Sequence, residues 1–107
     1  MRVQLHPQAE EELYEAARWY EEQLPGLGGD LMTEVEHWLD AIPETPLAWP
    51  LWPGVARVDP PIRRALLRRF PFAVSYQAFA KCIIVLAFAH TSRRPLYWMD
   101  RSHGQAE

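Results

Sequence analysis

Apolar and polar residues follow two different periodicities in the N-terminal part of the chain. Over residues 1–6, Val3 and Leu5 alternate with polar neighbours, which predicts a short strand. Apolar residues then recur at steps of three and four over 7–24 and again over 30–42, which predicts two amphipathic helices. Each helix has an apolar stripe too narrow to form a core alone. We therefore expect the two helices to form an antiparallel hairpin that packs on a sheet.

Proline and glycine indicate where these helices begin and end. Pro7 suits the first helical position, because its missing N–H would have no partner there. Pro25-Gly26 and Gly28-Gly29 favour a turn between the helices. Asp30 is a good N-cap residue, which predicts that the second helix begins there. Pro43 cannot continue this helix and predicts its end.

A loop rich in proline and tryptophan is predicted over residues 43–61. It contains six prolines together with Trp49 and Trp52. A connection of this length is uncommon in a small domain, and is either functional or held in place by its own side chains. Two interpretations are open: the tryptophans fix the loop to the edge of the core, or they bind a partner, since tryptophan is enriched at binding hot spots.

Strands are predicted within residues 62–90. Alternation over 72–77 predicts one strand, and the apolar run 82–89 predicts a central strand buried on both faces. Periodicity alone leaves 62–70 open between helix and strand, and Pro71 favours a bend after it. Sequential strands with short connections form an antiparallel sheet, with the helices on one side. The predicted fold class is therefore α+β, in one domain of 107 residues.

Composition indicates in which cellular compartment the protein is expected. Cys82 is the only cysteine, which excludes a disulfide framework and a paired-thiol metal motif. The longest apolar run has eight residues, against about 20 for a membrane-spanning helix, and the N-terminal residues contain no apolar signal core. We therefore expect a soluble cytoplasmic protein without a membrane partner.

The net charge of −3 conceals a strong asymmetry between the two parts of the chain. Residues 1–48 contain two basic and eleven acidic residues, a net charge of −9, whereas residues 49–107 contain nine basic and three acidic residues, a net charge of +6. We expect the two parts to form opposite faces. A basic face is compatible with an anionic partner, such as nucleic acid or an acidic peptide, and equally with ordinary solvation of the surface.

Candidate chemistry lies in arginine and aromatic residues of the basic half, including the basic, aromatic C-terminal segment 91–107. The chain has no familiar catalytic motif, and its four histidines lack metal-ligand spacing, so we expect no metal and no cofactor. Arginine recognises phosphate and carboxylate groups, and aromatic rings stack on bases. A second interpretation pairs the arginines with acidic residues of the helices or of a partner chain. The candidates for binding a target or partner are Arg64, Arg68, Arg69, His90, Arg93, Arg94, Tyr97 and Trp98.

Three segments together resemble one known family. They are VQLHPQAEEELYEAARWYEE at 3–22, IRRALLRRFPFAVSYQ at 62–77 and IIVLAFAHTSRRPLYW at 83–98. Their order and content resemble the RelE/ParE superfamily of bacterial type II toxins, in its plasmid-stabilisation group. The resemblance implies an N-terminal strand, a helix hairpin and an antiparallel sheet, and it favours a strand over 62–70. It also implies a partner, an antitoxin whose flexible segment folds onto the toxin and neutralises it.

The resemblance leaves the activity open between two kinds of toxin. RelE-like members cut messenger RNA on the ribosome without metal, using basic residues and a tyrosine, whereas ParE-like members inhibit DNA gyrase. If the chain is a nuclease, its catalytic candidates are Arg68, Arg93, Arg94 and Tyr97. Ala73 stands where RelE-like nucleases carry an arginine, which favours the ParE-like activity. A degenerate toxin that only binds its antitoxin is a third possibility.

Overall fold

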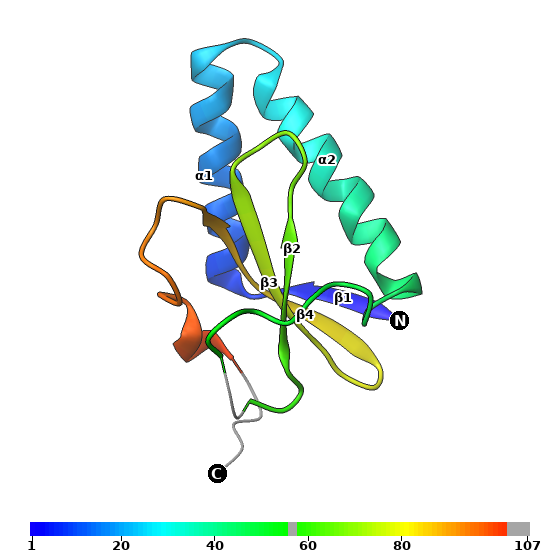
Figure 1. Cartoon of the computed structure of the whole chain (residues 1–107). Helices are drawn as coiled ribbons and strands as arrows, with labels where there is room; N and C mark the ends of the chain where they lie inside the picture. The colour runs from blue at the N-terminus through cyan, green and yellow to red at the C-terminus, as the bar shows by residue number, and fades with distance from the viewer. Residues whose placement is uncertain (56–57, 103–107) are drawn as a thin grey trace.

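A four-stranded sheet with two helices on one face forms the protein (Figure 1). The computed structural model describes residues 1–55 and 58–102. The predicted α+β class is confirmed. In chain order the elements are β1 (Arg2–Leu5), α1 (Pro7–Gln23), α2 (Leu27–Ala41), the 3-10 helix η1 (Ile42–Glu44), β2 (Ile62–Leu66), β3 (Phe72–Ala78), β4 (Cys82–His90) and the 3-10 helix η2 (Met99–Arg101).

The strand order is β1-β4-β3-β2. Strands β2, β3 and β4 form the predicted antiparallel arrangement, with Leu66 opposite Ala73 and Ala73 opposite Ala89. Strand β1 pairs with β4 in parallel, so the sheet is mixed, not purely antiparallel. A parallel pair requires a long connection between its strands, and the helix hairpin together with β2 and β3 supplies it. Strand β4 is therefore central and is buried on both faces, as its apolar run predicts.

Each face of the sheet has its own apolar core. On one face, residues such as Leu13, Val35 and Tyr76 pack between the helices and the sheet. On the other, Trp98 is fully buried beside Leu86. The two faces are covered by different parts of the chain, because the helices cover the first and the loop before β2 and the C-terminal segment cover the second.

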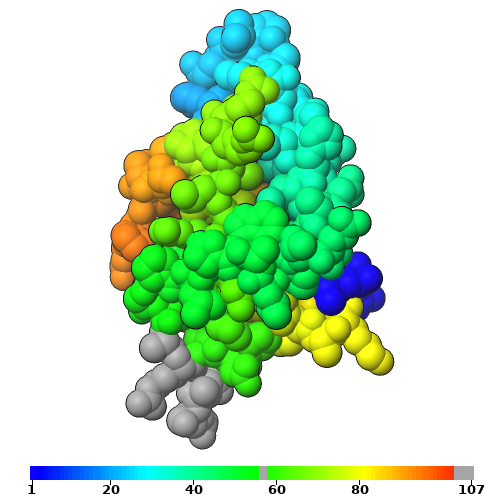
Figure 2. Space-filling view, turned by 45° about the vertical axis from the view of Figure 1, so that its right-hand side comes forward, coloured from blue at the N-terminus to red at the C-terminus, as the bar shows by residue number. Residues whose placement is uncertain are grey.

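The two loop tryptophans pack on opposite sides of the sheet. The Trp49 ring makes an edge-to-face contact with Trp38 of α2, with 6.3 Å between centroids, and the Trp52 ring makes one with Trp98 at 4.8 Å. The guanidinium of Arg63 donates to the carbonyl of Trp49 at 2.8 Å. The tryptophans thus fix the loop to both cores, and Figure 2 shows the loop, in green, lying across the front of the molecule.

Helix α2 begins three residues earlier than predicted, at Leu27 and not at Asp30. Gly26 occupies the N-cap with φ of 94°, a conformation that glycine adopts without strain. Glu21 of α1 accepts hydrogen bonds from the backbone N–H groups of Gly26 at 2.9 Å and Gly28 at 3.1 Å. These N–H groups at the start of α2 are satisfied by a side chain of the preceding helix, so Asp30 is not needed as the cap.

Strand β2 ends at Leu66, so the predicted strand over 62–70 is too long. Arg68 and Arg69 lie in the turn between β2 and β3, where both backbone N–H groups donate to the carboxylate of Glu34 in α2. A backbone N–H that is bonded to a helix side chain cannot also join the strand ladder. This exchange of partners, together with Pro71, ends the strand.

Gly28→Ala is expected to lower the free energy of unfolding by about 1–3 kcal/mol, the usual cost of overpacking. A Cβ at Gly28 would lie 2.3 Å from the carbonyl oxygen of Ala17, so the two helices would have to separate. Gly29→Ala is the matched control, because a Cβ there meets nothing within 4 Å. Urea unfolding of both variants measures the difference. Equal effects of the two substitutions would contradict a close helix contact at Gly28.

Candidate functional site

The C-terminal segment lies against a free edge of β4. Strand β1 pairs with β4 only as far as Val85, which leaves the backbone groups beyond it without a strand partner on that side. The N–H of Phe88 donates to Glu12 Oε1 at 3.2 Å, and the carbonyl of Leu86 accepts from Arg101 Nη1 at 3.0 Å. Glu12 and Arg101 also form an ion pair at 3.0 Å, with side chains only 14% and 9% exposed. The Glu12–Arg101 pair therefore supplies hydrogen-bond partners to the backbone of β4 beyond the end of β1.

Tyr97 contacts both this ion pair and the exposed Arg93. Its hydroxyl donates to Glu12 Oε2 at 2.6 Å, and its ring carries the guanidinium of Arg93 at 3.9 Å from the centroid. Burial raises the pKa of Tyr97 well above its ordinary value, and the hydrogen bond to Glu12 and the charge of Glu12 raise it further. Tyr97 is therefore a neutral donor near pH 7, and it positions Arg93 at the surface.

The other candidates near the end of β4 differ in exposure. The ring of His90 packs edge-to-face on Phe72 at 5.2 Å, and its Nδ1 lies 2.7 Å from Ser92 Oγ. Arg94 is exposed. Trp98 is 0% exposed and packs on Trp52 as a core residue, and its role in binding a partner stays a prediction.

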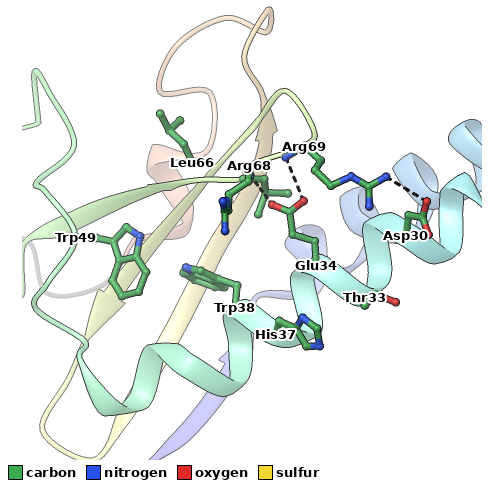
Figure 3. A pocket seen from close by; sticks show the side chains of 10 residues that line it. Asp30, Thr33, Glu34, His37, Trp38, Trp49, Leu66, Arg68 and Arg69 are labelled. Carbon is green, nitrogen blue, oxygen red and sulfur yellow. Dashed lines mark hydrogen bonds and ion pairs between the residues drawn. The ribbon is translucent and has the colours of Figure 1, made fainter.

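The three remaining candidate arginines lie on or after β2. The guanidinium of Arg64 lies over the Trp52 ring, 5.8 Å from its centroid, on the sheet face opposite the helices. Arg69 pairs with Asp30 of α2 at 3.3 Å, an exposed ion pair of the kind expected if arginines pair with helix carboxylates. Arg68 is exposed, and Figure 3 shows its guanidinium pointing over Trp38 into a groove.

This groove lies between α2 and the end of β2 and has a volume of about 780 Å³. Trp38 and Trp49 form its apolar side, and the side chain of Leu66, 58% exposed, lies at its edge (Figure 3). We call it the α2–β2 groove. It is lined by Asp30, Thr33, Glu34, His37, Trp38, Trp49, Leu66, Leu67, Arg68 and Arg69.

Five of the candidate residues thus gather in two places. One is the α2–β2 groove, with Arg68 and Arg69. The other is the C-terminal segment, with Arg93, Arg94 and Tyr97. The turns that carry these two sets adjoin, because the N–H of Thr91 donates to the carbonyl of Pro71 at 2.8 Å.

The sequence prediction missed Glu12, Arg101 and the groove. Glu12 lies three residues after buried Ala9 and four before Ala16, at the margin of the apolar stripe of α1. That position was the available signal. Nothing local in the sequence indicates Arg101, whose partner is 89 residues away. Tyr76, whose hydroxyl donates to the carbonyl of Pro46 at 2.7 Å, was likewise predicted only as a strand residue.

Neither a metal site nor a membrane span is found in residues 1–55 and 58–102. In these ranges no three His, Cys, Asp or Glu side chains are arranged to hold a metal ion. No helix there combines the length and apolar character needed to cross a bilayer.

Stability is expected to fall as the pH rises above about 10. Burial raises the pKa of Tyr76 to about 12, and Tyr97 is shifted in the same direction. Between its unfolded and folded pKa values, a tyrosine keeps its proton in the native protein and has lost it in the unfolded chain. Each of the two tyrosines therefore lowers the free energy of unfolding by up to about 1.4 kcal/mol per pH unit. Urea unfolding from pH 9 to 12 measures this slope. Tyr76→Phe should flatten it, and an equally steep slope in that variant would contradict the assignment.

Comparison with known proteins identifies the fold. No family model matches the chain, and no curated protein matches it in sequence. Among solved structures it is similar to a chain from the chromosomal ParDE toxin–antitoxin system of P. aeruginosa, with a TM-score of 0.72 and 15% identity over 86% of this chain and 97% of that one. The RelE/ParE-like fold implied by the sequence resemblance is therefore confirmed.

Proposed function

We propose that this protein is the toxin of a type II toxin–antitoxin system and that it inhibits DNA gyrase, as ParE-like toxins do, until a cognate antitoxin binds it. The observation that carries the proposal is the likeness to a chain of a ParDE system along nearly the whole length of both chains. The proposal places the protein in the cytoplasm, with its target. It requires neither a metal nor a cofactor.

The geometry around Tyr97 counts against RNA cleavage, the alternative to gyrase inhibition. A tyrosine that activates a ribose 2′-hydroxyl has to accept its proton, whereas the hydroxyl of Tyr97 donates to Glu12 and its pKa is raised. Ala73, at the position where RelE-like nucleases are expected to carry an arginine, is only 6% exposed. The sheet face at this point therefore lacks the cation that would stabilise a phosphate.

A RelE-like ribosome-dependent nuclease is the second candidate. Arg93, Arg94 and Arg68 are all exposed, and the first is held over the ring of Tyr97. This arrangement of cations beside a tyrosine supports RNA recognition even without an activated base. If this candidate is right, the chain is an enzyme and Tyr97 must lose its contact with Glu12 on the ribosome.

Induction of the protein in growing cells tests the proposal. Growth should stop, DNA damage responses should be induced, and co-expression of the cognate antitoxin should restore growth. Mapping of transcript ends in the same cells distinguishes gyrase inhibition from RNA cleavage, because new cleavage within codons identifies a nuclease. Normal growth on induction, combined with tight binding to the antitoxin, identifies a degenerate toxin and contradicts the proposal.

A double variant, Arg93→Ala with Arg94→Ala, is expected to need at least about tenfold more inducer for the same growth arrest, if the exposed cations bind an acidic target. Arg18→Ala, an exposed arginine on α1, is the matched control and should leave toxicity unchanged. Viable counts across an inducer series measure both. Full toxicity of the double variant would remove the C-terminal segment from the target-binding site.

A further inference from the structure

The turn that follows β4 holds a serine hydroxyl against a histidine ring. His90 ends β4, and the N–H of Arg93 donates to its carbonyl at 3.0 Å, which closes the turn over residues 90–93. Within this turn Ser92 Oγ lies 2.7 Å from His90 Nδ1, and the N–H of Ser92 donates to the same nitrogen at 3.1 Å. Ser92 is exposed, and Figure 2 shows the turn, in orange, at the surface of the molecule. A reactant in solution can therefore reach the hydroxyl.

The hydrogen bonds of this turn fix where the neutral imidazole carries its proton. A backbone N–H can only donate, so Nδ1 of His90 accepts from the N–H of Ser92 and carries no hydrogen itself. The ring proton therefore lies on Nε2, and the hydroxyl of Ser92 has to donate to Nδ1. The hydroxyl proton is thus already directed at a base, which is the arrangement that makes a serine nucleophilic.

The ring of His90 is held in place by its neighbours. It packs edge-to-face on Phe72, which is buried, with 5.2 Å between the ring centroids. The N–H of Thr91 donates to the carbonyl of Pro71 at 2.8 Å and so ties the turn to the adjoining β2–β3 turn. A hydroxyl, a base within hydrogen-bond reach and a further group that orients the base are the recurring parts of an activated nucleophile. All three are present at Ser92.

The charges around Ser92 favour a phosphoryl group as the group that it accepts. Arg93 and Arg94 follow it directly and are exposed, and arginine recognises phosphate through its planar fork of donors. The other two serines lack this setting, because Ser75 is 0% exposed and the hydroxyl of Ser102 donates to the carbonyl of Met99 at 2.8 Å. A phosphoserine adds a charge of about −2 near neutral pH. At Ser92 this charge would offset those of both arginines.

We propose that Ser92 is a phosphoryl acceptor activated by His90, and that its phosphorylation prevents the C-terminal segment from binding the target. Ser92 Oγ attacks the γ-phosphorus of a nucleoside triphosphate presented by a kinase, and the bond from this phosphorus to the leaving nucleoside diphosphate breaks. The hydroxyl proton passes to His90 Nδ1. The effect on target binding rests on the proposed function, in which Arg93 and Arg94 bind the target. The acceptor chemistry of Ser92 does not depend on it.

A fluorophosphonate probe tests the acceptor, because it phosphonylates activated serine hydroxyls with loss of fluoride. Mass spectrometry of the purified protein should find the label on Ser92 and not on Ser102. His90→Asn should label at least about tenfold more slowly, since an asparagine carbonyl can still accept the N–H of Ser92 but is not a base. His37→Asn, at an exposed histidine of α2, is the matched control and should label at the parent rate. Absence of label, or equal rates in His90→Asn and the parent protein, would overturn the acceptor site.

Protein made with phosphoserine in place of Ser92 tests the effect on the target. Inhibition of gyrase supercoiling should require at least about tenfold more of it than of the unmodified protein. Phosphoserine in place of Thr45, an exposed loop residue, adds the same charge elsewhere and should leave inhibition unchanged. Equal inhibition by the two phosphorylated proteins would overturn the effect on target binding. If the unmodified protein does not inhibit gyrase, this effect and the proposed function both fail, while the labelling result still decides whether Ser92 is an acceptor.

Discussion

Glu12→Ala is expected to lower the free energy of unfolding by about 3–5 kcal/mol, the cost of removing one partner of a buried ion pair. The substitution leaves the Arg101 guanidinium, which is 9% exposed, without its carboxylate. It also removes the acceptor of the Tyr97 hydroxyl and of the Phe88 N–H. The three groups that meet at one carboxylate are disrupted together, and the C-terminal segment should detach from β4.

Urea unfolding of the variant measures this loss. Glu11→Ala is the matched control, because Glu11 is an exposed carboxylate next in sequence on the same helix, and it should change stability by no more than about 0.5 kcal/mol. Similar stabilities of the two variants would show that the buried pair does not hold the segment. A double-mutant cycle with Arg101→Met then isolates the coupling between the two charges.

Trp98→Ala is expected to destabilise the protein by about 3–5 kcal/mol, as for other buried aromatic side chains replaced by alanine. The side chain is fully buried under the sheet and packs against Trp52, which fixes the loop before β2. The cavity left behind should loosen the C-terminal segment and this loop together.

Thermal and urea unfolding check the effect of Trp98→Ala. Trp19→Ala removes the same side chain from α1, where it is 55% exposed, and is expected to cost far less. If Trp98 is instead a binding residue, its removal should abolish partner binding with unchanged stability. That result would show that Trp98 binds a partner and does not stabilise the fold.

Elements defined by local patterns were predictable from the sequence. Periodicity located α1 within one residue of its observed end, and the apolar run located β4 at the centre of the sheet. These patterns act through neighbours on the same helix or strand, so no distant residue has to be known. The parallel pairing of β1 with β4 depends on segments about 80 residues apart, and periodicity contains no information about it.

Three of the errors in the prediction share a physical cause, which is a carboxylate supplied by another element of the fold. Glu21 satisfies the first turn of α2 and moves its start to Leu27, and Glu34 ends β2 from a separation of 34 residues. Glu12 and Arg101 meet across 89 residues. Composition indicates the exposed arginines of the candidate site, but neither the buried Glu12–Arg101 pair nor the contact of Glu34 with the β2–β3 turn.

A supercoiling assay with purified gyrase is the most direct test of the central claim. The protein should inhibit supercoiling of relaxed plasmid in proportion to its concentration, and prior mixing with the purified antitoxin should restore activity. Arg18→Ala should inhibit as well as the parent protein. Unchanged supercoiling at every concentration of a folded protein would contradict the account.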